Sequence, residues 1–176
     1  KGLVHGNLKL SNILLTHPKA RGHGQILLLD PGFNPPMAPD PQGRITIAPE
    51  CLQGGEPTPS SDLYSLGVVF YQALTGVSPF DAAGGLALAK EKRSGIIASP
   101  SSRRLEVSAQ LDALLISLLQ PSPSSRPGSV DEVLRSLDFL EEEPTAPIKG
   151  QADITLPLRG RDRALRAMDE AIESLK

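Results

Sequence analysis

Apolar side chains recur along the chain at the spacing of several helices. The longest such segment, residues 63–75, is apolar almost all round a helix, which is typical of a helix at the centre of a core. Ser60, Ser61 and Asp62 precede it as good N-cap residues, and Gly76 follows it. We therefore expect a central, buried helix that begins near residues 60–62 and ends at Gly76.

Shorter helical patterns follow this segment. Leucine or valine recurs at helical spacing at 111, 114, 115 and 118 and again at 130, 133, 134 and 137, and prolines follow the first of these two segments. We expect these further helices over about residues 85–93, 107–119, 128–140 and 162–175.

The N-terminal part of the chain has shorter apolar runs. Residues 13–15 and 26–29 are apolar and flank a turn-rich stretch, which predicts a β-hairpin whose second strand is short, buried and ends at Asp30. Residues 31–43 contain five prolines and two glycines, so we expect an irregular, exposed loop there.

Composition narrows the class of protein. The chain has 176 residues and a formal net charge of −2 at pH 7, which argues against a broad basic face for nucleic acid. Cys51 is its single cysteine, so an internal disulfide and a cysteine-based zinc cluster are excluded. No apolar run approaches the roughly 18 residues of a membrane span.

Several short motifs occur in a fixed order along the chain. They are HGNLKLSN at 5–12, DPG at 30–32, APE at 48–50, Asp62 at the start of the buried helix, and Arg126 between two helices. Together they resemble the C-terminal lobe of a eukaryotic-type Ser/Thr protein kinase over about residues 1–140. The resemblance implies a kinase-like C-lobe that is mainly α, with a short β-hairpin and long loops.

The resemblance assigns roles to three residues of a nucleotide site. Lys9 matches the lysine that neutralises the transferring phosphate, Asn12 matches a metal ligand, and Asp30 matches the aspartate that holds magnesium. ATP and Mg²⁺ are therefore the cofactors expected for the full-length domain. Oxygen ligands suit Mg²⁺, and a lysine offsets charge on phosphoryl oxygens.

The resemblance also implies structural roles. Asp62 is expected to brace the 5–12 loop, and Glu50 to pair with Arg126. His5 is expected to pack and hydrogen-bond rather than to catalyse.

The sequence departs from the family pattern at four positions. Asn7 stands where the family has its catalytic aspartate, and Gly6 replaces the arginine that receives a phosphorylated activation loop. Pro31 replaces the phenylalanine of the magnesium motif, and Gly43 replaces a threonine that couples substrate docking to the 5–12 loop. These changes favour a pseudokinase with a signalling or regulatory role. An active Ser/Thr kinase that transfers the γ-phosphate of ATP to protein hydroxyls is the alternative, and a non-kinase interaction module is a third.

The kinase N-terminal lobe has no counterpart in the sequence. The Gly-rich phosphate loop and the strand lysine of the family are absent, so we expect this chain by itself to bind ATP poorly. Because the chain also starts within a motif, we interpret it as part of a longer protein. The helix that normally precedes the 5–12 loop is absent too. We therefore expect exposed apolar surface on the buried helix.

The end of the chain is distinct from the rest. Residues 141–155 form a charged, proline-containing linker, and residues 156–176 predict a tail helix after the sequence LRGRD. This tail is similar to the start of an AAA or STAND-type ATPase module, and an amphipathic tail helix is the alternative. The expected partner is a protein substrate or a regulated domain, and the expected location is the cytoplasm.

Overall fold

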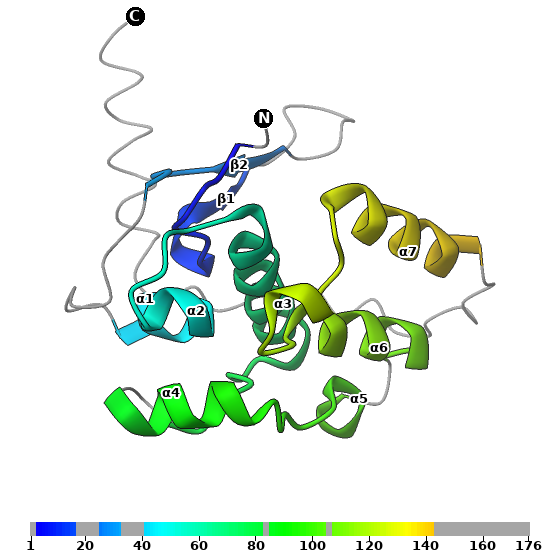
Figure 1. Cartoon of the computed structure of the whole chain (residues 1–176). Coiled ribbons are helices and arrows are strands. Elements are labelled where there is room, and N and C mark those ends of the chain that lie inside the picture. The colour runs from blue at the N-terminus through cyan, green and yellow to red at the C-terminus, as the bar shows by residue number, and fades with distance from the viewer. Residues whose placement is uncertain (1–2, 17–24, 33–40, 83–84, 105–106, 143–176) are drawn as a thin grey trace, which may run out of the picture. The chain divides into compact units, whose positions relative to one another are not determined.

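The computed structural model describes residues 3–16, 25–32, 41–82, 85–104 and 107–142 (Figure 1). The chain divides into one unit, Lys1–Glu143, and a second, Pro144–Lys176. Residues 141 and 142 of the linker expected over 141–155 lie in the helix Val130–Glu142. The rest of that linker and the tail helix expected over 162–175 lie outside the described residues.

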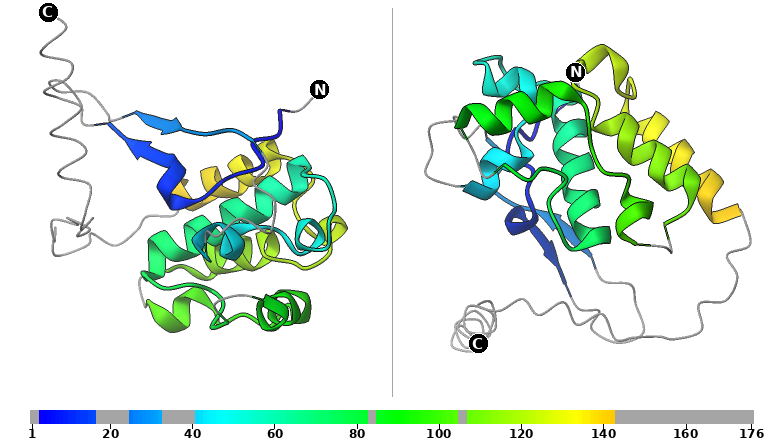
Figure 2. Two further views of the ribbon diagram at one scale, coloured as in Figure 1. Left: turned by 90° about the vertical axis from the view of Figure 1, so that its left-hand side faces the viewer. Right: turned by 90° about the horizontal axis from the view of Figure 1, so that it is seen from below.

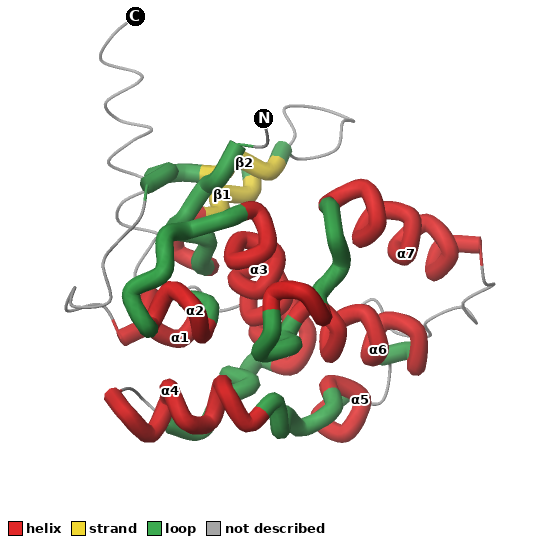
Figure 3. Tube along the Cα trace, in the orientation of Figure 1, coloured by secondary structure: helices red, strands yellow, loops and turns green. Residues whose placement is uncertain are grey.

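The first unit is mostly helical, with one two-stranded sheet (Figure 3). A 3-10 turn, Leu10–Asn12, leads into strand β1, and the long helix α3 lies among the other helices in Figure 1. In chain order the elements after that turn are β1 Ile13–Leu15, β2 Ile26–Leu28, α1 Pro41–Thr46, α2 Pro49–Leu52, α3 Pro59–Thr75, α4 Gly85–Ser94, α5 Pro100–Arg103, α6 Ala109–Leu118, a 3-10 turn Pro123–Ser125, and α7 Val130–Glu142.

Helix α3 begins slightly earlier than its sequence predicts. Thr58 is the N-cap, and it forms a capping box with Ser61: the Ser61 N–H donates to Thr58 Oγ1 at 3.2 Å, and the Thr58 N–H donates to Ser61 Oγ at 2.8 Å. Pro59 occupies the first turn, where its missing N–H costs nothing. Gly76 ends the helix with φ +76°, as predicted, because glycine adopts this left-handed conformation without strain.

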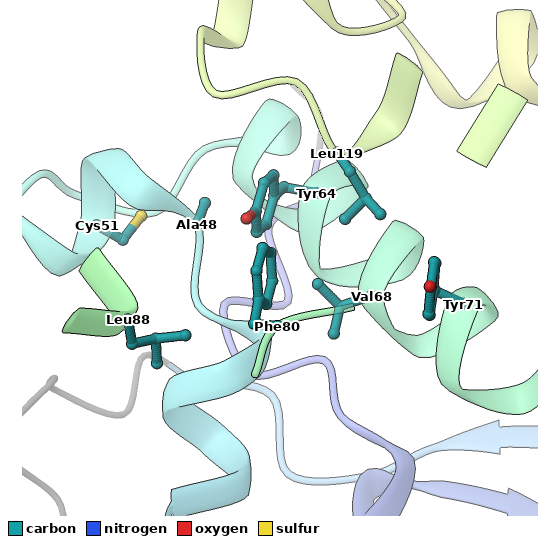
Figure 4. Close-up of a cluster of buried hydrophobic side chains, with 8 residues drawn as sticks. All are labelled: Ala48, Cys51, Tyr64, Val68, Tyr71, Phe80, Leu88 and Leu119. Atoms are coloured by element: carbon teal, nitrogen blue, oxygen red, sulfur yellow. The ribbon is translucent and has the colours of Figure 1, made fainter. Parts of the chain in front are cut away.

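Two clusters of buried side chains pack on α3. The larger joins α2, α3, α4 and the end of α6, and in Figure 4 the rings of Tyr64 and Phe80 lie next to one another. The smaller joins α3 to α6 and α7. Helices α3 and α6 approach closely at Gly67, where a Cβ would lie 2.8 Å from the Cβ of Leu118. The expectation of a central, buried helix is therefore confirmed.

One part of α3 is less covered. Phe70 is only half-buried and Ala73 is exposed. No large apolar side chain of α3 is exposed, so the exposed apolar surface expected on this helix is not found.

The three helices expected after α3 are present as α4, α6 and α7. Their ends differ from the predicted ranges by one or two residues. Ser108 caps α6 by accepting a hydrogen bond from the Leu111 N–H at 3.2 Å, which moves the start of that helix beyond residue 107.

The hairpin pairs as predicted, but its second strand is not buried. Residues Ile13 and Leu15 pair with Leu28 and Ile26 in an antiparallel register. Ile26 is 65% exposed and Leu28 is 54% exposed, because the hairpin lies at one edge of the helical body in both views of Figure 2. The prediction of a buried second strand, which rested on its apolar residues alone, is therefore wrong.

The proline-rich segment is not irregular throughout. Helix α1 begins at Pro41, within the loop expected over 31–43. Proline is tolerated in the first turn of a helix, so this residue starts regular structure here instead of breaking it.

Candidate functional site

The 5–12 loop is fixed to the first turn of α3. The backbone N–H of His5 donates to Asp62 Oδ2 at 2.6 Å, and that of Gly6 donates to Oδ1 at 2.9 Å. Gly6 has φ +69°, a conformation that favours glycine. Both carboxylate oxygens of Asp62 are used, so the bracing role expected for this residue is confirmed.

Asn7 connects this loop to the turn after β2. Its Nδ2 donates to the backbone oxygen of Asp30 at 3.2 Å, and its own N–H donates to His5 Nδ1 at 3.3 Å. A carboxylate has no hydrogen to donate when ionised. The Asn7 amide therefore makes a contact that an aspartate at this position would lose.

Asn12 and Asp30 come from the two segments that Asn7 joins. The Asn12 side chain is 5% exposed and donates from Nδ2 to the Asn7 oxygen at 2.9 Å, which leaves Oδ1 as the oxygen that could bind a cation. Asp30 is exposed and has φ +53°, and the Leu29 N–H donates to the Asn12 oxygen at 2.8 Å. The backbone segments that carry Asn12 and Asp30 are therefore hydrogen-bonded to one another.

The remaining site residue, Lys9, lies in the same loop and is half-buried. Its backbone oxygen accepts from the Asn12 N–H at 2.9 Å and so closes the 3-10 turn. Within the described ranges, no three His, Cys, Asp or Glu side chains gather at a metal site.

A pocket lies beside this loop, between it, the α1–α2 segment and the start of α3. It is a small hollow with a cavity volume of about 20 Å³, and it is partly open to solvent. Its walls include Asn7, Gly43, Thr46 and Cys51. Ser65 Oγ donates to the Thr46 oxygen at 2.9 Å and ties this wall to α3. Gly43, which the sequence analysis marked as a departure from the family pattern, is therefore part of the pocket.

The ion pair expected between Glu50 and Arg126 is present, with Arg126 buried and Glu50 half-buried. Two guanidinium nitrogens of Arg126 lie 2.6 and 2.8 Å from the two Glu50 carboxylate oxygens. The other N–H groups donate to backbone oxygens of Ser60, Gln120 and Pro121 at 2.8–3.0 Å. The guanidinium also lies over the Tyr64 ring at 4.8 Å from its centroid. All five donors of the arginine are thus satisfied.

A second buried cation, Lys92, was not identified from the sequence. Its Nζ lies 3.0, 2.7 and 2.5 Å from the backbone oxygens of Arg44, Ile45 and Ile47. Burial lowers the pKa of Lys92 to about 7, and the negative charges of Glu50 and Glu91 oppose this shift. One sequence signal was available, because Lys92 follows the buried Leu88 by four residues and so shares its face of α4.

A braced loop, an aspartate turn beside it and a buried Glu–Arg pair are the features of a protein kinase catalytic core. A family model described as "Protein kinase domain" matches residues 1–137. The chain belongs to the protein kinase family.

Relatives of this chain are serine/threonine kinases. Serine/threonine-protein kinase A of Synechocystis sp. is 34% identical over 157 residues, which cover 82% of this chain and 29% of that protein. Serine/threonine-protein kinase PknB of Mycobacterium tuberculosis is 28% identical over 159 residues, covering 83% of this chain and 24% of that protein. The chain thus spans about a quarter to a third of the length of these relatives.

The fold has a counterpart among solved structures. The crystal structure of Rad53 1-466 in complex with AMP-PNP aligns with a TM-score of 0.61 and 23% identity, over 76% of this chain and 33% of that one. This likeness establishes a kinase fold. In the part of the chain that the structure describes, no helix has the length and apolar character needed to cross a membrane.

Proposed function

We propose that this chain is part of a Ser/Thr protein kinase-like domain that acts as a pseudokinase, with a signalling or regulatory role based on binding. The observation that carries the proposal is the position of Asn7. Its amide donates to the Asp30 backbone oxygen at 3.2 Å, so the residue at the catalytic-base position acts as a structural link. An amide is also a poor acceptor for the proton of a substrate hydroxyl.

The loss of a base need not remove nucleotide binding. Phosphoryl transfer depends mainly on positioning and electrostatics, and the residues for these tasks are kept. We propose that Asn12 and Asp30 would hold Mg²⁺ and that Lys9 would contact the phosphates of ATP when the rest of the domain is present. The bound ion would offset phosphate charge.

A protein is the proposed partner. The pocket beside Asn7 has a backbone wall at residues 43–47, and Gly43 leaves this wall without the threonine hydroxyl of the family pattern. Because that threonine couples substrate docking to the 5–12 loop in the family pattern, we propose that a polypeptide bound at this surface would not be turned over efficiently. A regulated domain could also follow residue 156, and the tail sequence LRGRD is the support for an ATPase module there.

An active Ser/Thr kinase is the second candidate. The retained set of Lys9, Asn12 and Asp30 favours it. General-base help contributes about 10²- to 10⁴-fold, so a kinase without it would be slow rather than inactive.

Nucleotide binding and phosphate transfer in the full-length protein test both candidates. We would measure the thermal shift caused by Mg-ATP and the transfer of labelled γ-phosphate to a protein substrate. Wild type should bind Mg-ATP with little or no transfer, and Asp30→Ala should abolish the shift. Asn7→Asp should raise transfer by about 100-fold or more if only the base is missing. Asn7→Ala is the matched control, since it also removes the amide contact with Asp30 but adds no base.

Each outcome decides between the candidates. Rapid transfer by wild type would refute the pseudokinase proposal and support the active kinase. No Mg-ATP binding by wild type or by Asn7→Asp would refute the nucleotide site and favour an interaction module.

A further inference from the structure

Lys92 lies far from Asn7 in the sequence but contacts the segment that forms the pocket wall. It extends from α4, it is 1% exposed, and its amine nitrogen lies among three backbone oxygens. These oxygens belong to residues 44, 45 and 47, at the end of α1 and in the turn that follows it. The last carbonyls of a helix have no partner within the helix, so they need an external donor.

The number of N–H donors on Lys92 matches the number of carbonyl oxygens around it. A protonated lysine has three N–H donors, and three carbonyl oxygens surround it. The faces of Tyr64 and Phe80 lie 5.4 and 5.1 Å from the nitrogen and add a favourable cation–π environment. A buried lysine with so many partners holds the backbone turn more firmly than van der Waals contact would.

The turn that Lys92 holds is the turn that lines the pocket. Thr46 and Ile47 are pocket residues, and Ser65 binds the Thr46 oxygen from α3. The wall is therefore held from two sides, by Ser65 on α3 and by Lys92 on α4. Neither residue belongs to the catalytic motifs.

We propose that Lys92 is a positioning residue for the pocket beside Asn7. It fixes the 44–47 backbone from α4 and so sets the shape of that pocket. The assignment of this pocket to a polypeptide partner rests on the proposed function. The positioning itself is a property of the described contacts and can be measured without nucleotide or partner.

Cys51 provides a reporter for the pocket wall. It is the single cysteine of the chain, it lines the pocket, and it is only 2% exposed. A thiol reagent can reach it only when the wall opens. We would measure its labelling by N-ethylmaleimide in the full-length protein at pH 6.5, with quantification of the Cys51 peptide by mass spectrometry.

The test compares two substitutions on the same helix. Lys92→Met keeps an unbranched apolar stem but removes all three donors, whereas Lys90→Met removes an exposed lysine two residues away. We expect Lys92→Met to label at least about tenfold faster than wild type, and Lys90→Met to label within about twofold, because local opening is controlled by the contacts that are lost. Amide exchange in α6 serves as the reference for global unfolding and should not change.

Two outcomes of this comparison would overturn the proposal. Unchanged labelling in Lys92→Met would mean that the lysine does not hold the wall. Faster labelling with an equal acceleration of α6 exchange would mean that Lys92 only supports global stability.

Amide exchange in the unmodified chain gives a second, independent test if Lys92→Met does not fold. The Ile47 N–H, which donates to the Gly43 oxygen at 3.2 Å, should be protected to a degree comparable with α4. Exchange of this amide at the rate of an unstructured chain, with α3 still protected, would overturn the proposal. Because neither test uses nucleotide, failure of Mg-ATP binding would count against the proposed function alone.

Discussion

Arg126→Lys tests how strongly the buried ion pair holds the α2 segment to the rest of the core. The substitution keeps the positive charge but replaces a planar group with five donors by an ammonium with three. Arg126 uses its five donors on both oxygens of Glu50 and on three backbone oxygens. At least two of these contacts must therefore be lost.

The structure sets the size of the effect. A hydrogen bond to a charged group contributes about 1.5–3 kcal/mol, so two lost bonds correspond to about 3 kcal/mol or more. Glu50 is 24% exposed, which lets water replace part of the lost pairing, so we take the lower end. For a chain of this length, a loss of about 3 kcal/mol lowers Tm by roughly 6–12 °C.

Urea denaturation followed by circular dichroism measures this change. Arg103→Lys is the matched control, since Arg103 is an exposed arginine on α5, and it should stay within about 0.5 kcal/mol of wild type. If the free energy of unfolding of Arg126→Lys also stays within about 1 kcal/mol of wild type with an unchanged m-value, the guanidinium contacts of Arg126 do not stabilise the fold as argued.

Four further changes test other parts of the structure. Asp62→Asn replaces a carboxylate that accepts two backbone N–H groups, so amide exchange in the 5–12 loop should accelerate by about tenfold or more while α6 is unaffected. Gly67→Ala places a Cβ 2.8 Å from the Leu118 Cβ, and denaturation should show a net loss of about 1–2 kcal/mol after the better helix propensity of alanine is subtracted from the overpacking. Tyr64→Phe removes a buried hydroxyl that has no hydrogen-bond partner among the described residues, so the free energy of unfolding should stay the same or rise by up to about 1 kcal/mol. Burial lowers the pKa of Lys92 from 10.5 to about 7, so between these values the unfolded chain binds more protons than the folded chain. The free energy of unfolding should therefore rise with pH across this window, by at most about 1.4 kcal/mol per pH unit, and Lys92→Met should flatten the rise. Unchanged loop exchange, a more stable Gly67→Ala, a clearly less stable Tyr64→Phe or a fall in stability over this pH range would contradict the respective argument.

The motifs made the 5–12 loop and the ion pair predictable, because their residues are distinctive and their order is fixed. The motifs correctly predicted that Asp62 braces the 5–12 loop and that Glu50 pairs with Arg126. The position of β2 was also predictable, but its exposure was not, since an apolar run gives no information about whether another layer covers it. The five prolines and two glycines of residues 31–43 predict an irregular loop, but helix α1 begins at Pro41 because proline also starts helices.

The Lys92 contact was harder to predict for a different reason. Its three acceptors are backbone oxygens, which carry no sequence signature. The position of Lys92 on the apolar face of α4 is a sign that its side chain is buried, but it does not identify the oxygens that accept its hydrogen bonds. Contacts of this kind depend on the path of the backbone about 45 residues away, and only a structure supplies that path.

The scaffold of the site and the chemistry of the site use different residues. Asp62 holds the 5–12 loop, and the Glu50–Arg126 pair joins α2 to the start of α3 and to the end of α6. Ser65 and Lys92 bind the backbone of the pocket wall, and none of these contacts depends on an acid at position 7. Replacing the catalytic aspartate by Asn7 therefore removes a base without removing a support, and the amide even adds a contact to Asp30. A kinase fold can for this reason lose catalysis while it keeps a well-formed pocket, which is the physical basis for proposing a binding role.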